Sequence, residues 1–293
     1  MTVAGRAARE GWIKWVAFFC ALISVATTFG IVWTLLGQAL PFFRAVPLGS
    51  FLGGVEWRPT GEPPAFGILP LVAGTLLVTA GAGLIAIPLG LLVAIYLSEY
   101  AHPRVRGFLK PALELLAGIP TVVYGYLGLF LVTPALKRIW PETQTTNAAA
   151  GAIVVGIMIL PFVSSLCEDA LEAVPRGLRE AAIGLGSTKG ETIARIVLPS
   201  AMSRVMASFI LALSRAMGET MAVALAAGAN PNLTFDPRRS VETMSAFIVS
   251  TSEGDAAAGT TKYTSLFAVA VVLFALTLLM HVAAGRTIRR IRG

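Results

Sequence analysis

The sequence predicts an all-α polytopic membrane protein with six transmembrane helices. Hydrophobic residues make up 56% of the 293 residues and charged residues only 13%, whereas a soluble domain carries charge on about a quarter of its residues. Long apolar stretches recur along the chain, and basic residues concentrate in alternate connections between them. Because so few charges cannot cover a globular surface of this size, a lipid bilayer is the expected solvent.

The first apolar stretch carries no charge between Lys14 and Arg44, which exceeds the roughly 20 residues needed to cross the hydrocarbon core. A secretory signal has a shorter apolar centre followed by a small-residue cleavage site, so this stretch is expected to stay in place as an anchor. The N-terminal part of the chain is therefore divided into a cytoplasmic segment 1–14 and a region 15–67, which holds the first helix and the loop after it.

Five further stretches are long and apolar enough to span the bilayer. They cover approximately residues 68–97, 115–136, 148–166, 200–228 and 265–284. The fifth stretch contains Arg204 at its start and both Arg215 and Glu219 in its interior. Together with the first helix these stretches give six crossings, so both termini are expected on the same side of the membrane.

The distribution of the 23 Lys and Arg residues orients the helices, because short loops rich in basic residues stay in the cytoplasm. Most of them lie at the termini, in residues 104–110 and in the segment 176–204, all on one side. The protein is thus expected in the cell (plasma or inner) membrane with both termini cytoplasmic, and its net charge of +7 is explained by topology rather than by nucleic-acid binding. Loops 44–67, 137–147 and 229–264 then face outside, either as docking surfaces or as ordinary connecting loops.

The segment 167–199 is the longest predicted cytoplasmic connection, and its pattern indicates two short helices joined by glycines. Pro175 precedes a stretch that can start a helix, which Gly184 and Gly186 interrupt. Residues 189–197 form a second amphipathic piece before the chain returns to the bilayer. Such an element can lie in a groove of a partner protein or rest on lipid headgroups, and the pattern leaves both readings open.

A spaced motif within this segment resembles the EAA loop of the permease subunits of ABC importers. The motif residues are Glu180, Ala181, Ala182, Gly186, Ile196, Leu198 and Pro199. The resemblance implies that 68–285 is a type-1 ABC transmembrane permease domain, with a five-helix core plus the N-terminal helix and a basic cytoplasmic tail at 286–293. It also implies that 167–199 is a coupling loop. This loop would fit a cleft on a separate ATPase and pass the closure of that ATPase to the membrane helices.

Two further stretches resemble the phosphate-specific transport system. Residues 116–125 are similar to the third-helix signature of phosphate permeases, with Thr121 where serine is commoner, and residues 215–223 are similar to the PstC-type subunit rather than to its PstA-type sister. The resemblance implies a second permease of the PstA type, two copies of a PstB-type ATPase and an extracytoplasmic phosphate-binding protein of the PstS type. ATP and Mg would be hydrolysed by the ATPase, and no cofactor or metal is expected on this subunit.

Arg215 and Glu219 are the main candidates for the substrate pathway. Charged side chains inside a bilayer are costly and face a pore or a partner, and a spacing of four places both on one face of a continuous helix. Arg215 is expected about 24 Å along that helix from Pro199, where its guanidinium can bind an anion. An ion pair that only locks helices together is the alternative. Thr121 and Tyr124 offer hydroxyls near Pro120, where the third helix is expected to break.

Other functions remain open at this point. Permeases for molybdate, tungstate or sulfate share the coupling loop, and a secondary anion transporter also carries charges within its spans. An intramembrane hydrolase needs a nucleophile and a base at helical spacing, and the spans show no such pair. Because the sequence also has no Gly-Lys-Ser/Thr phosphate loop, no catalytic residues are expected, and this subunit is not predicted to hydrolyse ATP.

Overall fold

The computed structural model describes the backbone of residues 3–254, 256–257 and 259–292, and the side chains of residues 12–254, 256–257 and 259–286. Within this part of the chain the predicted all-α architecture is confirmed, and six helices are long and apolar enough to cross a membrane. The predicted N-terminal segment 1–14 and basic tail 286–293 lie for the most part outside the described side chains.

Three of the six spans are single helices, and three are joined from shorter helices by wider, π-helical turns. The single helices are α1 (Val3–Ala45), α7 (Ala148–Glu172) and α13 (Thr261–Arg292). The joined spans are α3 (Leu69–Ile95) with η1 (Tyr96–Tyr100); α5 (Thr121–Leu127) with η2 (Gly128–Val132) and α6 (Thr133–Ile139); and α9 (Lys189–Thr192) with η3 (Ile193–Val197) and α10 (Leu198–Met217).

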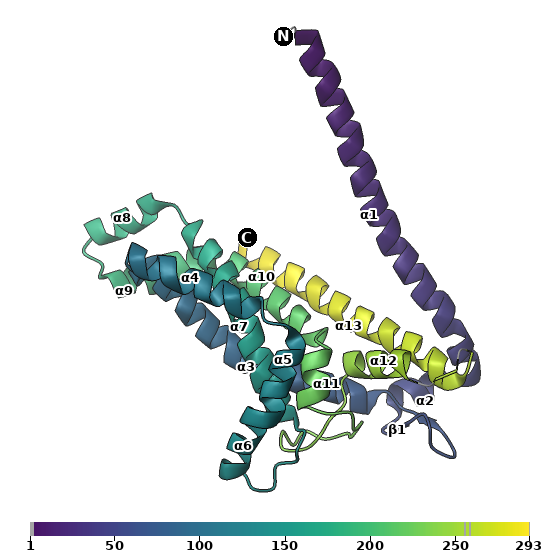
Figure 1. Ribbon diagram of the computed structural model, residues 1–293. Coiled ribbons are helices and arrows are strands. Elements are labelled where there is room, and N and C mark those ends of the chain that lie inside the picture. Colours follow the sequence, from purple (N-terminus) through teal and green to yellow (C-terminus); the bar gives the residue numbers. More distant parts are fainter. Residues whose placement is uncertain (1–2, 255, 258, 293) are drawn as a thin grey trace.

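Shorter elements connect the spans at both ends. They are α2 (Leu48–Gly53), α4 (Pro103–Ala117), α8 (Arg176–Gly184), α11 (Met221–Ala226), α12 (Met244–Glu253), and the antiparallel strands β1 (Trp57–Arg58) and β2 (Ala65–Phe66). In Figure 1, α8 and α9 lie at one extremity of the molecule, whereas α6, β1 and the long loops lie at the other.

Helix α7 is the most buried of the described spans and forms the centre of the bundle. It packs against α3 and α10, and small residues allow the close approach. A Cβ added to Gly90 of α3 would lie 2.7 Å from the side chain of Val163 on α7. Glycine is therefore required at this helix crossing.

Helix α1 diverges from the bundle along most of its length (Figure 1). Its apolar side chains are exposed there in the single chain, including Trp15 and Trp33. Only its C-terminal end is anchored, through contacts with α13 and a buried aromatic cluster in which Phe42 packs edge-to-face on Phe51 and Phe66 with ring centroids 5.3 Å apart. The exposed part fits a helix surrounded by lipid or by another subunit.

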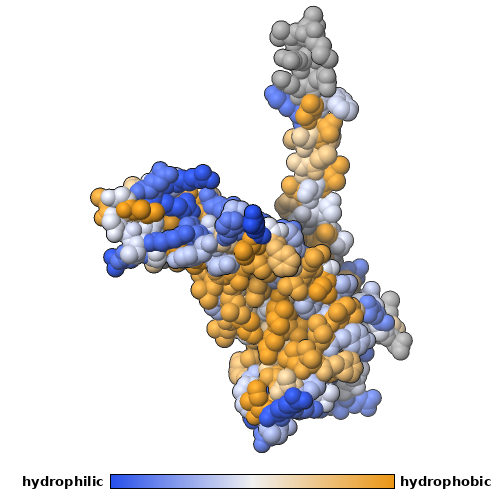
Figure 2. Space-filling model, turned by 60° about the vertical axis from the view of Figure 1, so that its left-hand side comes forward, coloured by the Kyte–Doolittle hydropathy of each residue, from blue (hydrophilic) through white to orange (hydrophobic). Residues whose placement is uncertain are grey.

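The surface polarity is arranged as a bilayer requires. Figure 2 shows an apolar band across the visible face of the body, with hydrophilic side chains gathered at its two ends. One polar end is formed by the region of α8 and α9, and the other by the region around α6. Lipid tails can cover the band, while water and headgroups cover the ends.

Two of the π turns lie directly before prolines in the middle of a span. η2 precedes Pro134, and η3 precedes Pro199. A proline inside a helix lacks an N–H, and its ring clashes with the carbonyl four residues earlier. The wider turn moves that carbonyl away from the ring. Both helices therefore continue through their prolines, which a sequence pattern would take as helix ends.

The third and fourth spans differ from their predicted bounds. The third was predicted to begin near residue 115 but begins at Thr121, because residues 103–117 form the separate amphipathic helix α4. The N-terminal part of α4 lies in the basic segment 104–110, which was expected to be a loop. The fourth was predicted to end at 166 but continues to Glu172, where Glu168 and Glu172 form ion pairs with Arg106 or Lys110 of α4.

Helix α12 was not predicted, because the loop 229–264 was expected to be a connection. Its ten residues are too few to span a membrane. Thr243 caps its N-terminus by accepting a hydrogen bond from the Ala246 N–H (3.2 Å), and the Met244 N–H donates to Thr75 Oγ1 on α3 (3.0 Å). These contacts hold α12 as a buried plug against α3 and α13.

Candidate functional site

The loop that carries the EAA-like motif folds as the sequence predicts, with a glycine turn between two helices. Helix α8 ends at Gly184, and Gly186 has a φ of 91°. The Gly186 N–H donates to the Ile183 carbonyl (2.9 Å). The Ser187 N–H donates to the Ala182 carbonyl (3.1 Å), which completes a Schellman helix end. Only glycine adopts this backbone conformation without strain.

After the turn, a capping box starts α9. The Thr188 N–H donates to Glu191 Oε2 (2.9 Å), and the Glu191 N–H donates to Thr188 Oγ1 (3.3 Å). From there the chain runs through η3 into α10 without interruption. The amphipathic piece predicted at 189–197 is therefore not separate from the fifth span, because the π turn before Pro199 allows the helix to continue.

The motif residues divide into an exposed and a packed set. Glu180 and Ala181 face outward on α8, and Gly186 and Pro199 are also exposed. Ala182 is buried against the bundle, whereas Ile196 and Leu198 are half-buried. Three apolar side chains of α8 and its turn also face outward, namely Leu178, Ile183 and Leu185. This end of the molecule thus presents exposed apolar side chains beside the acidic Glu180.

A charge network lies at this same end, between α4 and α7. Glu168 is 1% exposed and contacts Arg106 Nη2 through Oε1 (2.6 Å) and Lys110 Nζ through Oε2 (3.3 Å). Arg106 also pairs with Glu172. Partial burial opposes the charge of Arg106, but Glu168 and Glu172 raise its pKa above the usual value. Glu168 is compensated twice, so it stays paired if one of the two cations turns away.

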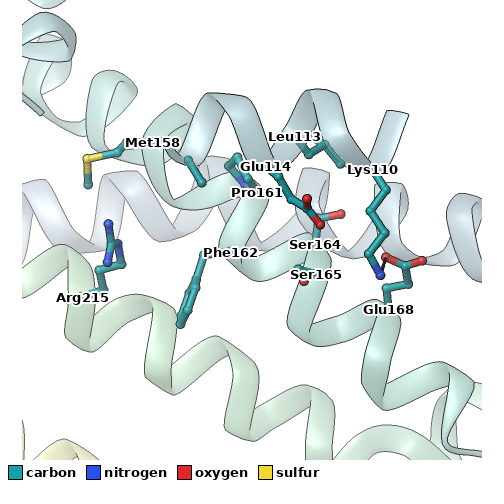
Figure 3. Close-up of a pocket in the computed structure, with 11 residues that line it drawn as sticks. Lys110, Leu113, Glu114, Met158, Pro161, Phe162, Ser164, Ser165, Glu168 and Arg215 are labelled. Carbon is teal, nitrogen blue, oxygen red and sulfur yellow. Dashed lines mark ion pairs between the residues drawn. The ribbon is translucent and has the colours of Figure 1, made fainter. Parts of the chain in front are cut away.

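Arg215 lines a cavity of about 310 Å³ between α4, α7 and α10. Figure 3 shows its guanidinium at one end of the cavity and Lys110 at the other. Ser164 and Ser165 lie between them, and the buried Ser164 Oγ has no hydrogen-bond partner among the described residues. Arg215 forms no ion pair within that same part of the chain, and the Phe162 ring lies 5.9 Å from its Cζ.

Two carboxylates also line this cavity, on the side of Lys110. They belong to Glu114 and Glu168 (Figure 3). Glu168 is engaged by its two cations, whereas Glu114 has no ion pair among the described residues. The cavity thus combines a free guanidinium, hydroxyls, an ammonium and a free carboxylate. Such a set can accept and donate hydrogen bonds to a protonated oxyanion.

The predicted single face for Arg215 and Glu219 is wrong. Helix α10 ends at Met217, so Arg215 lies in its last turn and Glu219 lies in the break before α11. Glu219 Oε1 accepts a hydrogen bond from the Ala222 N–H (3.3 Å), and the Glu219 carbonyl accepts one from Ser245 Oγ (2.7 Å). No ion pair joins Arg215 to Glu219 in the described part of the chain. Glu219 instead holds the start of α11 and the start of α12.

The structure places the two predicted hydroxyls differently. Thr121 is half-buried at the first position of α5, directly after the expected break at Pro120. Tyr124 is buried, and its hydroxyl donates to the Leu116 carbonyl at the end of α4 (2.7 Å). The Tyr124 proton is therefore engaged across the break. The glycine at 125 serves packing, since an added Cβ would lie 2.8 Å from the Leu225 side chain.

Sequence reasoning missed Lys110, Ser164 and Glu168 as residues of this site. The signal for Lys110 was present, because Arg106, Lys110 and Glu114 are spaced by four, which indicates one face of a helix. Glu168 follows directly after an uncharged stretch and was taken as part of a loop. Ser164 carries no sequence signal, because hydroxyls are common in membrane helices.

A second cavity of about 540 Å³ lies at the opposite end of the molecule. Glu242 lines it and is only 6% exposed. Burial raises the pKa of this carboxyl to about 7. Arg58 and Lys262 line the same cavity, but neither forms an ion pair with Glu242 among the described residues.

These features define a polytopic membrane protein whose protruding loop carries a motif that resembles the EAA loop of importer permeases. The family model described as "Binding-protein-dependent transport system inner membrane component" matches residues 86–293. The chain belongs to this family of ABC importer permeases, and it is therefore a multi-pass protein of the inner membrane.

Curated relatives narrow the comparison. The chain is 34% identical over 262 residues to "Probable ABC transporter permease protein YqgH" of Bacillus subtilis, covering 89% of this chain and 84% of the relative. It is 35% identical over 261 residues to "Phosphate transport system permease protein PstC" of Mesorhizobium japonicum, covering 83% and 79%. It is 30% identical over 325 residues to PstC 1 of Mycobacterium tuberculosis, covering 98% and 96%. The predicted resemblance to PstC-type permeases is confirmed.

Solved structures share the fold. A chain of a bacterial ABC transporter involved in the import of alginate superimposes with a TM-score of 0.68 at 16% identity, covering 98% of this chain and 100% of that one. A chain of the MetNI methionine ABC transporter in an inward-facing conformation gives a TM-score of 0.57 at 19% identity, covering 77% and 94%. The predicted importer-type permease fold is therefore confirmed.

Proposed function

We propose that this chain is the PstC-type permease of an ATP-driven importer and translocates inorganic phosphate. The observation that carries the proposal is Arg215, a guanidinium in a cavity within the spans and without an ion pair among the described residues. A charge in this position is costly unless it serves a pathway or a partner. Relatives named as phosphate permeases over most of the chain support phosphate as the anion.

The cavity chemistry suits a partly protonated oxyanion. Arg215 offers a fork of donors at one end, and Lys110 offers an ammonium at the other. Between them Ser164 Oγ is free to donate a hydrogen bond, and the Glu114 carboxylate is free to accept one from the hydroxyl that phosphate retains near neutral pH. Sulfate carries no such proton and would face the carboxylate without compensation. Thr121 is a further proposed contact of the anion. The Tyr124 hydroxyl and the Glu219 carboxylate are engaged in hydrogen bonds within the protein, so their proposed role is to hold the helices that surround the pathway.

The coupling part of the proposal places an ATPase on α8. Its outward face carries Glu180 beside the exposed Leu178, Ile183 and Leu185, which suits a groove of a partner better than a solvated surface. In this arrangement the loop and both termini are cytoplasmic. The full machine would contain a PstA-type second permease, two PstB-type ATPases that hydrolyse ATP with Mg, and an extracytoplasmic PstS-type receptor. This subunit itself binds no cofactor in the proposal.

The test is uptake by the reconstituted complex. The four kinds of subunit are co-expressed, purified and placed in vesicles with ATP inside the compartment that the α8 loop faces. Radiolabelled phosphate is supplied on the other side, and molybdate, tungstate and sulfate are added in turn as competitors. We expect ATP-dependent phosphate uptake that excess sulfate does not reduce. Preferred uptake of another oxyanion would transfer the proposal to that anion, and uptake driven by an ion gradient without ATP would reject it.

A further inference from the structure

Helix α8 is attached to the rest of the molecule through few side chains. Ala182 is its only residue classed as fully buried, and Leu178 and Ile183 face outward. The turn at Gly186 separates it from α9. A helix of nine residues is too short to be stable by itself. Its position must therefore be fixed by tertiary contacts, and the candidates for them are few.

Arg179 supplies the side-chain hydrogen bonds that tie α8 to the rest of the described chain. Its Nε and Nη2 donate to Glu99 Oε1, at 3.1 and 2.8 Å. Its Nη1 donates to the Val174 carbonyl (2.6 Å), and Nη2 also donates to the Leu171 carbonyl (2.8 Å). Glu99 belongs to η1 at the end of the second span, Leu171 to the last turn of α7, and Val174 follows that helix directly. One side chain thus ties α8 to the ends of two spans.

The chemistry of the contact explains why arginine is present. The Arg179 and Glu99 side chains are 18% and 9% exposed, so the pair is largely shielded from water and from salt. The last carbonyls of a helix carry partial negative charge, and the Leu171 carbonyl accepts from the Val174 N–H (3.2 Å) as well as from Arg179. A planar guanidinium reaches the carboxylate and both carbonyls at once from three separate nitrogens. A lysine ammonium would have to reach the same three acceptors from a single nitrogen.

We infer that Arg179 is a positioning residue that makes α8 move as one body with the ends of α3 and α7. The inference rests on the proposed docking of an ATPase at α8. Helix α7 also carries Phe162, Ser164 and Glu168 of the cavity wall. A displacement of α8 that is passed through Arg179 therefore reaches the wall of the proposed anion pathway directly. Without Arg179, α8 would follow the ATPase while the spans stay behind.

The functional test compares two arginines of the same helix. Arg176 lies three residues before Arg179, and both line a cavity of about 570 Å³, but the Arg176 side chain has no ion pair or hydrogen bond among the described residues. In the reconstituted complex, Arg179→Ala should retain the ATPase subunits and ATP hydrolysis but lose at least about fivefold in phosphate transported per ATP. Arg176→Ala should stay within about twofold of the unsubstituted protein in both measurements. Arg179→Lys should fall between them.

A second measurement does not depend on the transported anion. A nitroxide label at Leu185→Cys, in a background with Cys20→Ser and Cys167→Ala, reports the motion of α8, since Leu185 is 89% exposed. The label should become more mobile in Arg179→Ala and in Glu99→Gln, but not in Arg176→Ala. If Arg179→Ala does not accumulate in the membrane, Glu99→Gln provides the same comparison in both measurements.

The outcomes separate the two proposals. Unchanged transport per ATP together with unchanged label mobility in Arg179→Ala and Glu99→Gln would overturn the inference. An equal loss in Arg176→Ala would also overturn it, because the effect would then reflect charge at α8 rather than the contact. If the unsubstituted complex transports no phosphate while the label responds as expected, the choice of substrate fails and the role of Arg179 in holding α8 stands.

Discussion

The turn at Gly186 and the break at Gly218 both end a helix at a glycine beside charged residues, yet they are built differently. Gly186 has a positive φ and closes a turn whose hydrogen bonds all lie within a few residues. Gly218 has a φ of −87°, which any residue adopts, and an added Cβ there would meet only carbonyl oxygens at 3.8 Å. The first helix end is determined locally, whereas the second is held in place by α12 and α11.

The comparison teaches which glycine is indispensable. At Gly186 the backbone itself demands glycine. At Gly218 the helix ends because the Glu219 N–H donates to the Ala216 carbonyl (3.2 Å) and because Ser245 of α12 donates to the Glu219 carbonyl. The following predictions test this difference, beginning with the largest expected effect.

Substitution at Gly186 should give the largest loss. An L-residue in the left-handed region costs about 1–2 kcal/mol, and a β-branched side chain makes the turn still less accessible. In Gly186→Val the turn should rearrange and displace α8, so ATP-dependent uptake should fall to background while membrane insertion is retained. The matched control is Gly184→Val, because Gly184 is helical with open space around it. Full uptake in Gly186→Val would contradict the local account of this turn.

Substitution of Arg215, on the helix that the break ends, should give the second largest effect. A hydrogen bond to a charged group contributes about 1.5–3 kcal/mol, so Arg215→Ala should lower phosphate uptake by roughly ten- to hundredfold with the complex intact. Arg204→Ala, on the same helix but outside the cavity, serves as the control. Equal uptake in both variants would show that Arg215 only packs against the Phe162 ring.

The sequence predicted one of these two helix ends and missed the other for a physical reason. The turn at Gly186 is encoded in adjacent residues, so a local motif is sufficient to locate it. The break after Met217 depends on Ser245, which is far along the chain, and no local rule contains that contact. The six spans follow from apolar length, whereas α12 and the separation of α4 from the third span follow from packing and from Pro120.

Of the site, sequence reasoning supplied Arg215 and the coupling motif but not their surroundings. Arg215 is conspicuous because charge is rare in spans. Lys110 and Glu168 were not recognised as neighbours of its cavity, because only the folding of α4 across α7 brings them together. The contact between Arg179 and Glu99 joins residues 80 positions apart, which a single sequence cannot reveal.

The start of α12 supports the break at Gly218, and its contribution to stability can be tested through the dependence of stability on pH. Glu242 immediately precedes the cap of α12 and has a pKa of about 7 instead of 4.5. The folded state therefore binds the proton more tightly, so stability is highest below pH 4.5 and is lost as pH rises through 7. The loss above pH 7 is on the order of 3 kcal/mol.

Glu242→Gln should remove this pH dependence. In detergent, its Tm should exceed that of the unsubstituted protein at pH values above the Glu242 pKa and approach it in acid. Lys262→Gln is a useful companion, because it removes a cation from the same cavity without removing the carboxyl. A parallel pH dependence of Tm in Glu242→Gln and in the unsubstituted protein would show that this carboxyl titrates elsewhere.

The smallest effect is expected at Tyr124, which lies on α5, the helix that packs against α11. Tyr124→Phe removes the hydrogen bond to the Leu116 carbonyl, and such a bond contributes about 1 kcal/mol. Thermal unfolding should show this small loss, and the order of oxyanion preference in uptake should not change. A changed preference would restore the Tyr124 hydroxyl to the list of substrate contacts.

The uninterrupted helix from Lys189 to Met217 has a consequence for communication across the membrane. Its 29 residues extend for roughly 43 Å at 1.5 Å per residue. The turn at Gly186 lies before its first residue, and Arg215 lies in its final turn. Tilting this helix by about 5° around its Lys189 end shifts the Arg215 guanidinium by roughly 3 Å, the length of a hydrogen bond. In the proposed pathway, inclination of this helix would move Arg215 relative to the anion, in addition to the motion of α3 and α7 that Arg179 transmits.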